Sequence, residues 1–251
     1  MNKRTYRIGQ IVPSSNITME TEVPLMLSRA VVPNDVTFTF HSSRAPMKNV
    51  SAPELAAMNG HMERCARELS DARMDIVASA CLVAIMSQGP GYHKKTQAEL
   101  EAVCHVEAPD TQVITSAGAL VDSLKAIGAK RISFITPYMK NLTELVAGYI
   151  ENEGIKVKDT ISLEIPNNLE VGAQDPNNLI EIVKRLDTSD VDAVVLSACV
   201  QMPSLSALAE VQKNFDVPVL STAAATVFQI LKALNLPTVV PDAGGLLSGK
   251  Y

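Results

Sequence analysis

The sequence contains no tryptophan, and Phe, Trp and Tyr together make up only 4% of its 251 residues. It also carries no excess of positive charge, because 27 acidic residues outnumber 22 basic ones and give a formal net charge of −5. Nucleic-acid binding depends on a basic surface and, for single strands, on aromatic side chains that stack on bases. The composition therefore argues against a nucleic-acid partner. A small anion can still bind through backbone N–H groups and helix N-termini.

Long apolar runs are also missing. No stretch approaches the roughly 18 apolar residues that a membrane-spanning helix needs. The N-terminal MNKRTYRIGQIV lacks the apolar core and small-residue cleavage site of a secretory signal peptide, and it is typical of the start of a strand. We therefore expect no membrane partner and a cytoplasmic location.

The four cysteines form no C-x-x-C pair, and the four histidines are scattered along the chain. Their spacing matches neither a zinc site nor a disulfide framework. The one adjacent Cys/His pair, Cys104 and His105, falls in a helical stretch. The sequence also lacks G-x-G-x-x-G, P-loop and H-E-x-x-H motifs. We expect free thiols, no metal and no cofactor.

The sequence does contain a regular alternation of short β-branched runs with longer helical segments such as SAPELAAMNGHMERCARELS. Such alternation predicts βαβ units and parallel sheets. Because the runs scarcely alternate between apolar and polar residues, we expect helices on both faces of each sheet. The predicted strands are Tyr6–Val12, Val36–His41, Asp75–Ala80, Thr111–Ser116, Arg131–Thr136, Val157–Ile165, Asp192–Ala198 and Val217–Thr222.

The two halves of the chain resemble each other. RIGQIVPSSN from Arg7 aligns with RISFITPYMK from Arg131, and SACLVA from Ser79 aligns with SACVQM from Ser197. ITSAGALVDSLKAIG likewise resembles LSTAAATVFQILKALN further along the chain. Three matches in the same order favour a duplicated α/β unit over the similarity of any two βα units. We predict an α/β fold of two halves related by a pseudo-two-fold axis. Each half has a mostly parallel four-stranded sheet flanked by helices, and the active site lies in the cleft between the halves.

The duplication also predicts the domain organisation. We place the first half at residues 1–116, with Cys81, and the second at residues 117–221, with Cys199. Each half then has the size of a small domain. We expect the helical segment 222–235 to complete the first half and residues 236–251 to form a loop-like C-terminal tail.

Cys81 and Cys199 each follow a predicted parallel strand. Ligands bind at the carboxyl ends of such strands, so two facing halves would place the two thiols on opposite faces of one small flat substrate. Pro203 falls where a first helical turn would begin, which predicts a helix N-terminus near Cys199 and a stabilised thiolate there. Cysteine is commonly a buried core residue. We assign that role to Cys65 and Cys104, which fall inside helical segments, whereas equivalent strand ends favour a functional role for Cys81 and Cys199.

Polar turns follow other strands at the same predicted edge. VPSSN contains Asn16, TPYMKN contains Tyr138, and PNNLEVG contains Asn167 and Asn168. The asparagines are equally typical of helix caps and turns, whereas a tyrosine directly after a proline is an unusual cap. The residues after the two cysteines offer backbone N–H groups that could form donor nests for a carboxylate, namely Leu82, Val83, Val200 and Gln201.

Two half-chain α/β units with a cysteine at each strand end, together with the turns VPSSN, TPY and NNLEVG, resemble the aspartate/glutamate racemase superfamily. Within it they are most similar to the maleate cis-trans isomerases, over nearly the whole chain. The resemblance implies cofactor-independent isomerisation of maleate to fumarate, with Cys81 as the nucleophile that forms a succinyl-cysteine and Cys199 as general acid/base. It implies that Asn16, Tyr138 and Asn168, with the backbone after each cysteine, bind the small dicarboxylate. It further implies a homodimer and, by analogy, a step in nicotinate degradation.

Three other functions fit parts of this pattern. An aspartate/glutamate-type racemase would also use two thiols, but it needs an acceptor for the substrate ammonium, and Glu170 is the acid close to the polar turns. A non-catalytic dicarboxylate-binding protein would use the same cleft without needing thiols. A thiol-redox protein would need the two Cα atoms within about 7 Å of each other. A cleft that holds a four-carbon diacid would keep them further apart.

Overall fold

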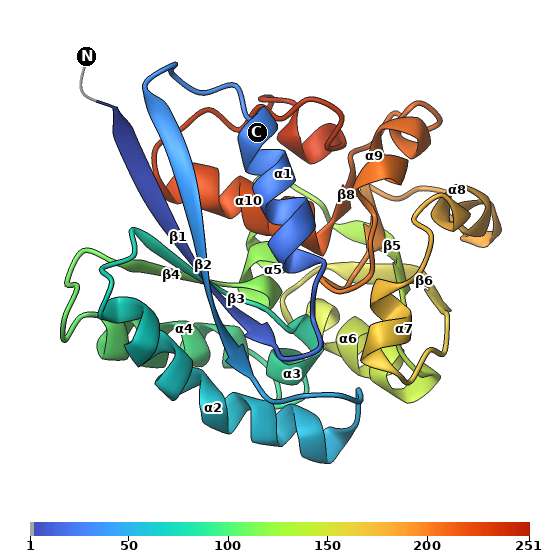
Figure 1. Ribbon diagram of the computed structural model, residues 1–251. Coiled ribbons are helices and arrows are strands. Elements are labelled where there is room, and N and C mark those ends of the chain that lie inside the picture. The colour runs from blue at the N-terminus through green and yellow to red at the C-terminus, as the bar shows by residue number, and fades with distance from the viewer. Residues whose placement is uncertain (1–2) are drawn as a thin grey trace.

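The computed structural model describes residues 3–251, and two separate parallel sheets organise the chain (Figure 1). The first sheet has the order β2-β1-β3-β4 and the second the order β6-β5-β7-β8. All neighbouring strands pair in parallel. The two sheets repeat one topology, which confirms the predicted fold class. The strands are β1 (Arg4–Pro13), β2 (Val36–Ala45), β3 (Ile76–Ser79), β4 (Gln112–Thr115), β5 (Arg131–Thr136), β6 (Lys156–Ser162), β7 (Ala193–Ser197) and β8 (Val219–Ser221).

All eight predicted strands are present, and the largest errors lie at the ends of β2 and β6. β6 ends at Ser162 rather than Ile165 because Glu164 adopts a left-handed backbone with φ 56°, which a strand cannot contain. β2 continues past His41 to Ala45, although its sequence there becomes polar. The pairing partner explains the extension, because β1 continues beside it as far as Pro13.

Helices cover both faces of the first sheet. Figure 1 shows α2 and α4 on one side and α1 and α10 on the other, and the contacts between these elements agree with that arrangement. No helix formed by residues 3–251 is long and apolar enough to cross a membrane. The helices are α1 (Met19–Arg29), α2 (Ala52–Ser70), α3 (Leu82–Met86), α4 (Tyr92–Cys104), α5 (Ser116–Ala126), α6 (Lys140–Asn152), α7 (Asn168–Gly172), α8 (Asn178–Ile182), α9 (Leu205–Gln212) and α10 (Thr222–Ala233), with short 3-10 turns at Val183–Arg185 and Gly245–Leu247.

Equivalent helices in the two halves begin in the same way. The side chain of Thr115 accepts a hydrogen bond from the N–H of Gly118 at the start of α5, and Ser221 accepts one from Ala224 at the start of α10. Helix α10 then packs against α1, β3 and β4, and also against α5. The division of the chain into residues 1–116, completed by 222–235, and residues 117–221 stays a prediction.

The C-terminal segment 236–251 is packed against the rest of the chain. Val240, Leu246 and Leu247 are buried, and Val239 forms an isolated bridge with Ser248. The carbonyl of Val239 also accepts a hydrogen bond from the N–H of Val31, just after α1. The segment is loop-like, as its sequence predicts, but its apolar side chains contribute to the core.

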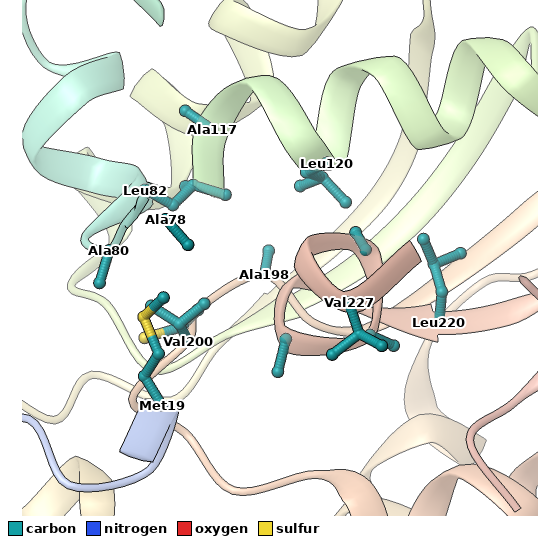
Figure 2. Close-up of a cluster of buried hydrophobic side chains, with 14 of the residues drawn as sticks. Met19, Ala78, Ala80, Leu82, Ala117, Leu120, Ala198, Val200, Leu220 and Val227 are labelled. Carbon is teal, nitrogen blue, oxygen red and sulfur yellow. The ribbon is translucent and has the colours of Figure 1, made fainter. Parts of the chain in front are cut away.

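A continuous apolar core joins the two halves directly behind the cysteines. Ala80 and Leu82 flank Cys81, while Ala198 and Val200 flank Cys199, and all four are at most 2% exposed. Figure 2 shows these side chains together with Met19 at the start of α1. Burial of each larger aliphatic side chain contributes about 1.5–3 kcal/mol. Cys81 and Cys199, in front of this core, are themselves only 7% and 6% exposed.

Candidate active site

A small cavity lies between the carboxyl ends of the two sheets, and both halves line it. Pro13, Met47 and Val50 form part of its wall. The structure also brings every site residue predicted from the sequence to this one cavity, namely Asn16, Cys81, Leu82, Val83, Tyr138, Asn168, Cys199, Val200 and Gln201. Because these residues come from β-strand ends and turns of both halves, the duplicated topology is what assembles them.

Cys81 lies between β3 and α3 in a strained backbone conformation. Its φ of 74° is left-handed, which costs a non-glycine residue about 1–3 kcal/mol. The turn places the thiol at the N-terminus of α3, facing the backbone of Ala84. The pKa of the Cys81 thiol is raised to about 12 by burial, the largest cause, with the Ala84 backbone lowering it and the nearby Cys199 raising it.

The predicted helix start at Pro203 is wrong, because α9 begins at Leu205. The hydroxyl of Ser197 donates to the carbonyls of Cys199 and Met202, at 2.9 and 3.2 Å, and keeps them in a loop. Cys199 therefore does not lie at a helix N-terminus.

The thiol of Cys199 is buried, and burial raises its pKa above the ordinary value. The pKa of Cys199 is lowered, to a smaller extent, by hydrogen bonds from the side chain of Tyr138 and from the backbone of Gln201 and Met202. The expected stabilisation of the thiolate is thus outweighed by burial in this closed cavity.

Two side chains offer the cavity neutral hydrogen-bond donors. The carboxamide oxygen of Asn16 accepts from the N–H of Met19 at 3.0 Å, while its buried Nδ2 has no partner among the residues that the structure describes. Burial, followed by the nearby Cys199 and Cys81, raises the pKa of Tyr138 well above its ordinary value, so the phenol stays protonated. Both groups can donate to a carboxylate without adding a charge.

The two asparagines of PNNLEVG have different environments. Asn168 is buried against the cavity, and its Nδ2 donates to the hydroxyl of Ser15 at 2.8 Å. Asn167 instead caps α7, since its side chain accepts from the N–H groups of Leu169 and Glu170. Of the pair, Asn168 is the residue placed to contact a bound molecule.

Two segments meet across the cavity and cover it. Asn49, after β2, forms an antiparallel bridge with Asn167, after β6. The N–H of Val50 donates to the carbonyl of Pro166, and the N–H of Asn168 donates to the carbonyl of Lys48, both at 3.3 Å. The sequence reasoning missed the first segment, with Met47 and Val50. The duplication was the available signal, because β2 and β6 are equivalent strands.

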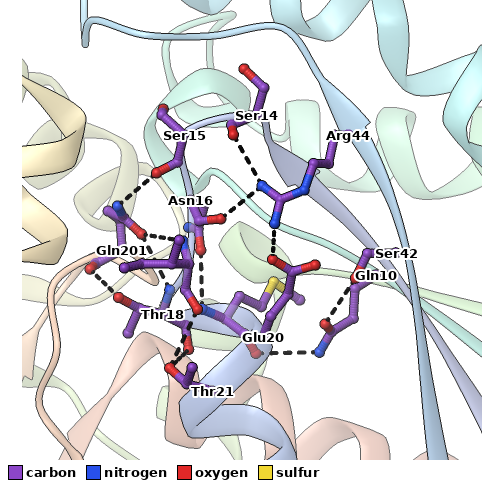
Figure 3. A network of polar contacts seen from close by, with 12 residues as sticks. Gln10, Ser14, Ser15, Asn16, Thr18, Glu20, Thr21, Ser42, Arg44 and Gln201 are labelled. Carbon is purple, nitrogen blue, oxygen red and sulfur yellow. Dashed lines mark hydrogen bonds and ion pairs between the residues drawn. The ribbon is translucent and has the colours of Figure 1, made fainter.

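The turn that carries Asn16 is held from outside the cavity by Arg44. Its guanidinium donates to the carbonyls of Ser14 and Asn16, each at 3.0 Å, and pairs with Glu20 (Figure 3). Within the described part of the chain, the cavity wall itself contains no Asp, Glu, Lys, Arg or His. Glu170 is exposed and does not line it. Residues 3–251 also hold no group of three or more His, Cys, Asp or Glu arranged for a metal ion.

Comparison with known proteins identifies the family of this chain. The sequence profile of the arylmalonate decarboxylase family matches residues 8–247. A maleate isomerase of Geobacillus stearothermophilus is 60% identical over 247 residues, which are 98% of this chain and 98% of that protein. The chain belongs to the maleate isomerase family. The resemblance predicted from the sequence is thereby confirmed.

Solved structures of maleate isomerases share the fold closely. A cysteine-to-alanine variant from Pseudomonas putida, with maleate, has a TM-score of 0.96 and 55% identity, with 99% of each chain covered. A cysteine-to-serine variant from Nocardia farcinica holds a covalently bound succinylcysteine intermediate. That structure has a TM-score of 0.94 and 42% identity, and the match covers 99% of this chain and 100% of the other. Cysteine chemistry on a four-carbon unit is therefore documented within the family.

Proposed function

We propose that this protein isomerises maleate to fumarate without a cofactor, with Cys81 as nucleophile and Cys199 as general acid/base. The observation that carries the proposal is the pair of free thiols from equivalent strand ends, which line one covered cavity together with neutral donors. In this proposal Asn16, Tyr138, Asn168 and the backbone after each cysteine bind the two carboxylates of the small dicarboxylate.

Rotation about a carbon–carbon double bond is blocked until the bond order falls. The Cys81 thiolate forms a C–S bond to C2 of maleate, and the π-electron pair moves to C3 beside a carboxylate. Donors such as Tyr138 stabilise the negative charge that develops there. The Cys199 thiol then gives its proton to C3, which leaves a succinyl-cysteine on Cys81 and a thiolate on Cys199.

The C2–C3 bond of this adduct is single and can rotate. The Cys199 thiolate takes a proton back from C3, the C–S bond breaks towards sulfur, and Cys81 leaves as a thiolate beside fumarate. The two sulfurs share one proton at the start and at the end, so the cycle is balanced. Because burial raises the pKa of both thiols and favours their protonated forms, one proton must pass from Cys81 to solvent water before the cavity closes over maleate and addition begins.

The cavity wall distinguishes this function from the alternatives. A racemase needs an acceptor for the substrate ammonium. Glu170, an acid within the turn PNNLEVG, is exposed and does not line the cavity, so it is not placed to accept that ammonium. A dicarboxylate-binding protein has no use for two facing thiols. A homodimeric, cytoplasmic enzyme of nicotinate breakdown is what family membership suggests, and these three features stay predictions.

Proton NMR of the vinyl signals tests the proposal directly. Purified protein in buffer with maleate and a reductant should produce fumarate, and the Cys81→Ala variant should produce none. Failure of the folded, reduced wild-type protein to form fumarate would overturn the proposal. Chiral chromatography after incubation with L-aspartate or L-glutamate would then reveal a racemase, and maleate binding without turnover would leave the binding protein.

A further inference from the structure

The side chain of Gln201 joins the loop after Cys199 to two other parts of the molecule. Its Oε1 accepts hydrogen bonds from the N–H groups of Ile17 at 3.1 Å and Thr18 at 3.4 Å. Its Nε2 donates to the carbonyl of Ser15 at 3.1 Å and to that of Asn168 at 2.9 Å. Figure 3 shows the carboxamide of Gln201 beside Ser15 and Thr18. Gln201 is 2% exposed, so its carboxamide is buried with all of these bonds formed.

The backbone of Gln201 contacts the sulfur of Cys199. Its N–H donates to the Sγ of Cys199 at 3.3 Å, and its carbonyl accepts from the hydroxyl of Thr18 at 2.7 Å. A displacement of the side chain therefore moves the donor that faces Cys199. The same residue contacts the thiol, the turn before α1 and the first residue of α7.

Gly172, at the end of α7, provides the space for this carboxamide. A Cβ atom on Gly172 would lie 2.5 Å from Nε2 of Gln201 and 3.1 Å from its Cδ. All three of the nearest atoms belong to Gln201. A glycine at position 172 is thus explained by the close approach of one side chain, and Gly172 itself does not line the cavity.

We infer that Gln201 is a positioning residue for Cys199, coupling the placement of that thiol to the seating of α7 and Asn168. The inference rests on the proposed function. When α7 lies against the carboxamide, Asn168 faces the cavity and Cys199 is held for proton transfer at C3. Loss of the coupling leaves C–S bond formation by Cys81 intact, and water can supply the C3 proton in place of Cys199, but removal of that proton needs a positioned base and is slowed.

The distinctive readout is the amount of succinyl-cysteine on Cys81, measured by acid quench and intact-protein mass spectrometry during turnover of maleate. In Gln201→Ala we expect kcat to fall on the order of 10²-fold, the cost of misplacing a reacting group by about 1 Å, and the adduct to accumulate. Gly172→Ala changes no cavity residue and should act in the same direction. In the double variant, the Gly172→Ala change should have little further effect, because the atoms it meets are gone.

Gln212→Ala is a matched control. Its carboxamide also makes four hydrogen bonds, donating to the carbonyls of Phe215 and Val217 and accepting from the N–H groups of Val219 and Gly245, but it lies outside the cavity wall. We expect Gln212→Ala to lower the melting temperature without adduct accumulation.

The inference would be overturned if Gln201→Ala and Gly172→Ala lowered the melting temperature as Gln212→Ala does, with no adduct. Fully additive effects of Gly172→Ala and Gln201→Ala on kcat would also overturn it. If Gln201→Ala does not fold, Gly172→Ala alone still shows whether the adduct accumulates or only the melting temperature falls. Absence of fumarate with wild-type protein would instead remove the proposed function, and this inference with it.

Discussion

Cys81 and Cys199 occupy the same position in the two halves, each two residues beyond the end of an equivalent strand, yet their backbones differ. Cys81 leads directly into α3, whereas a loop separates Cys199 from α9. The thiol of Cys81 faces the backbone of Ala84, and that of Cys199 faces Tyr138 and Gln201. The two sulfurs therefore have different surroundings, and the proposed division of addition and proton transfer between them requires such a difference.

Replacing Cys199 by serine should trap the covalent intermediate. Water can still protonate C3 after addition by Cys81, but a serine hydroxyl does not supply the thiolate base that removes this proton, so the adduct forms and is not resolved. We expect fumarate formation to fall by about 10²–10⁴-fold and a succinyl mass increment to appear, as the Nocardia farcinica structure suggests for its own enzyme. Cys81→Ser should show neither product nor increment. An increment located by peptide mapping on any other cysteine would contradict this assignment.

Replacing Tyr138 by phenylalanine should remove one donor to the developing charge while keeping the ring that packs in the wall. We expect kcat to fall by about 10²–10³-fold, as for the loss of one oxyanion donor, with little change in melting temperature. Steady-state kinetics and thermal denaturation together check this.

Tyr149→Phe is the matched control for that change. The Tyr149 hydroxyl bonds to the N–H and Nδ1 of His93, at 3.0 and 2.5 Å, away from the cavity. Its loss leaves buried polar groups unpaired, and we expect a destabilisation of about 1–3 kcal/mol with kcat nearly unchanged. Equal effects of the two variants on kcat would argue against a specific role for the Tyr138 hydroxyl.

Alkylation of Cys81 in the substrate-free protein should be slow and should accelerate steeply with pH. A thiol with a pKa of about 12 is ionised at pH 8 about 10³-fold less than one with the ordinary value of 9.0. We expect the rate of iodoacetamide labelling at Cys81 to rise about tenfold per pH unit through the alkaline range, because only the thiolate reacts. A plateau at or below neutral pH would show that the thiolate is already formed in the free protein.

The buried carboxylate of Glu22 should make stability depend on pH. It accepts from the N–H groups of Ser204 and Leu205 at 2.7 and 2.8 Å, yet burial outweighs these bonds and raises its pKa above 4.5. The folded protein therefore binds a proton that the unfolded chain has released, in the window between pH 4.5 and the raised pKa. Its contribution to stability is greatest below this window and is lost as pH rises through it.

The Glu22→Gln variant lacks this titrating group, so the difference between wild type and variant reports the contribution of Glu22 alone. The free energy of unfolding of wild type relative to Glu22→Gln should decline as pH rises from about 4 to 7, as measured by urea denaturation of both proteins. A difference that stays constant over this range would show that the Glu22 carboxyl does not change its protonation on folding.

The strands and the cavity residues were predictable because they depend on local pattern and on topology. β-branched runs gave the eight strands, and the duplication placed Cys81 and Cys199 at equivalent edges that must face each other. The cap that Glu22 supplies to α9 could not be predicted, since its partners lie more than 180 residues away along the chain. The same holds for the bonds that the Gln201 carboxamide makes to Ile17 and Thr18.

The segments that meet at Asn49 and Asn167 cover both thiols, so a hydrogen passed between Cys199 and C3, as proposed, would be shielded from bulk solvent while the segments stay joined. In heavy water the Cys199 thiol exchanges to S–D whenever the cavity opens to admit substrate, so the proposed mechanism places one deuterium on C3 in each passage. Fumarate stays unlabelled if the same atom is taken back, and it carries one deuterium if the original C3 hydrogen is removed instead. The isotope content of the fumarate would therefore show which C3 hydrogen the covered site removes.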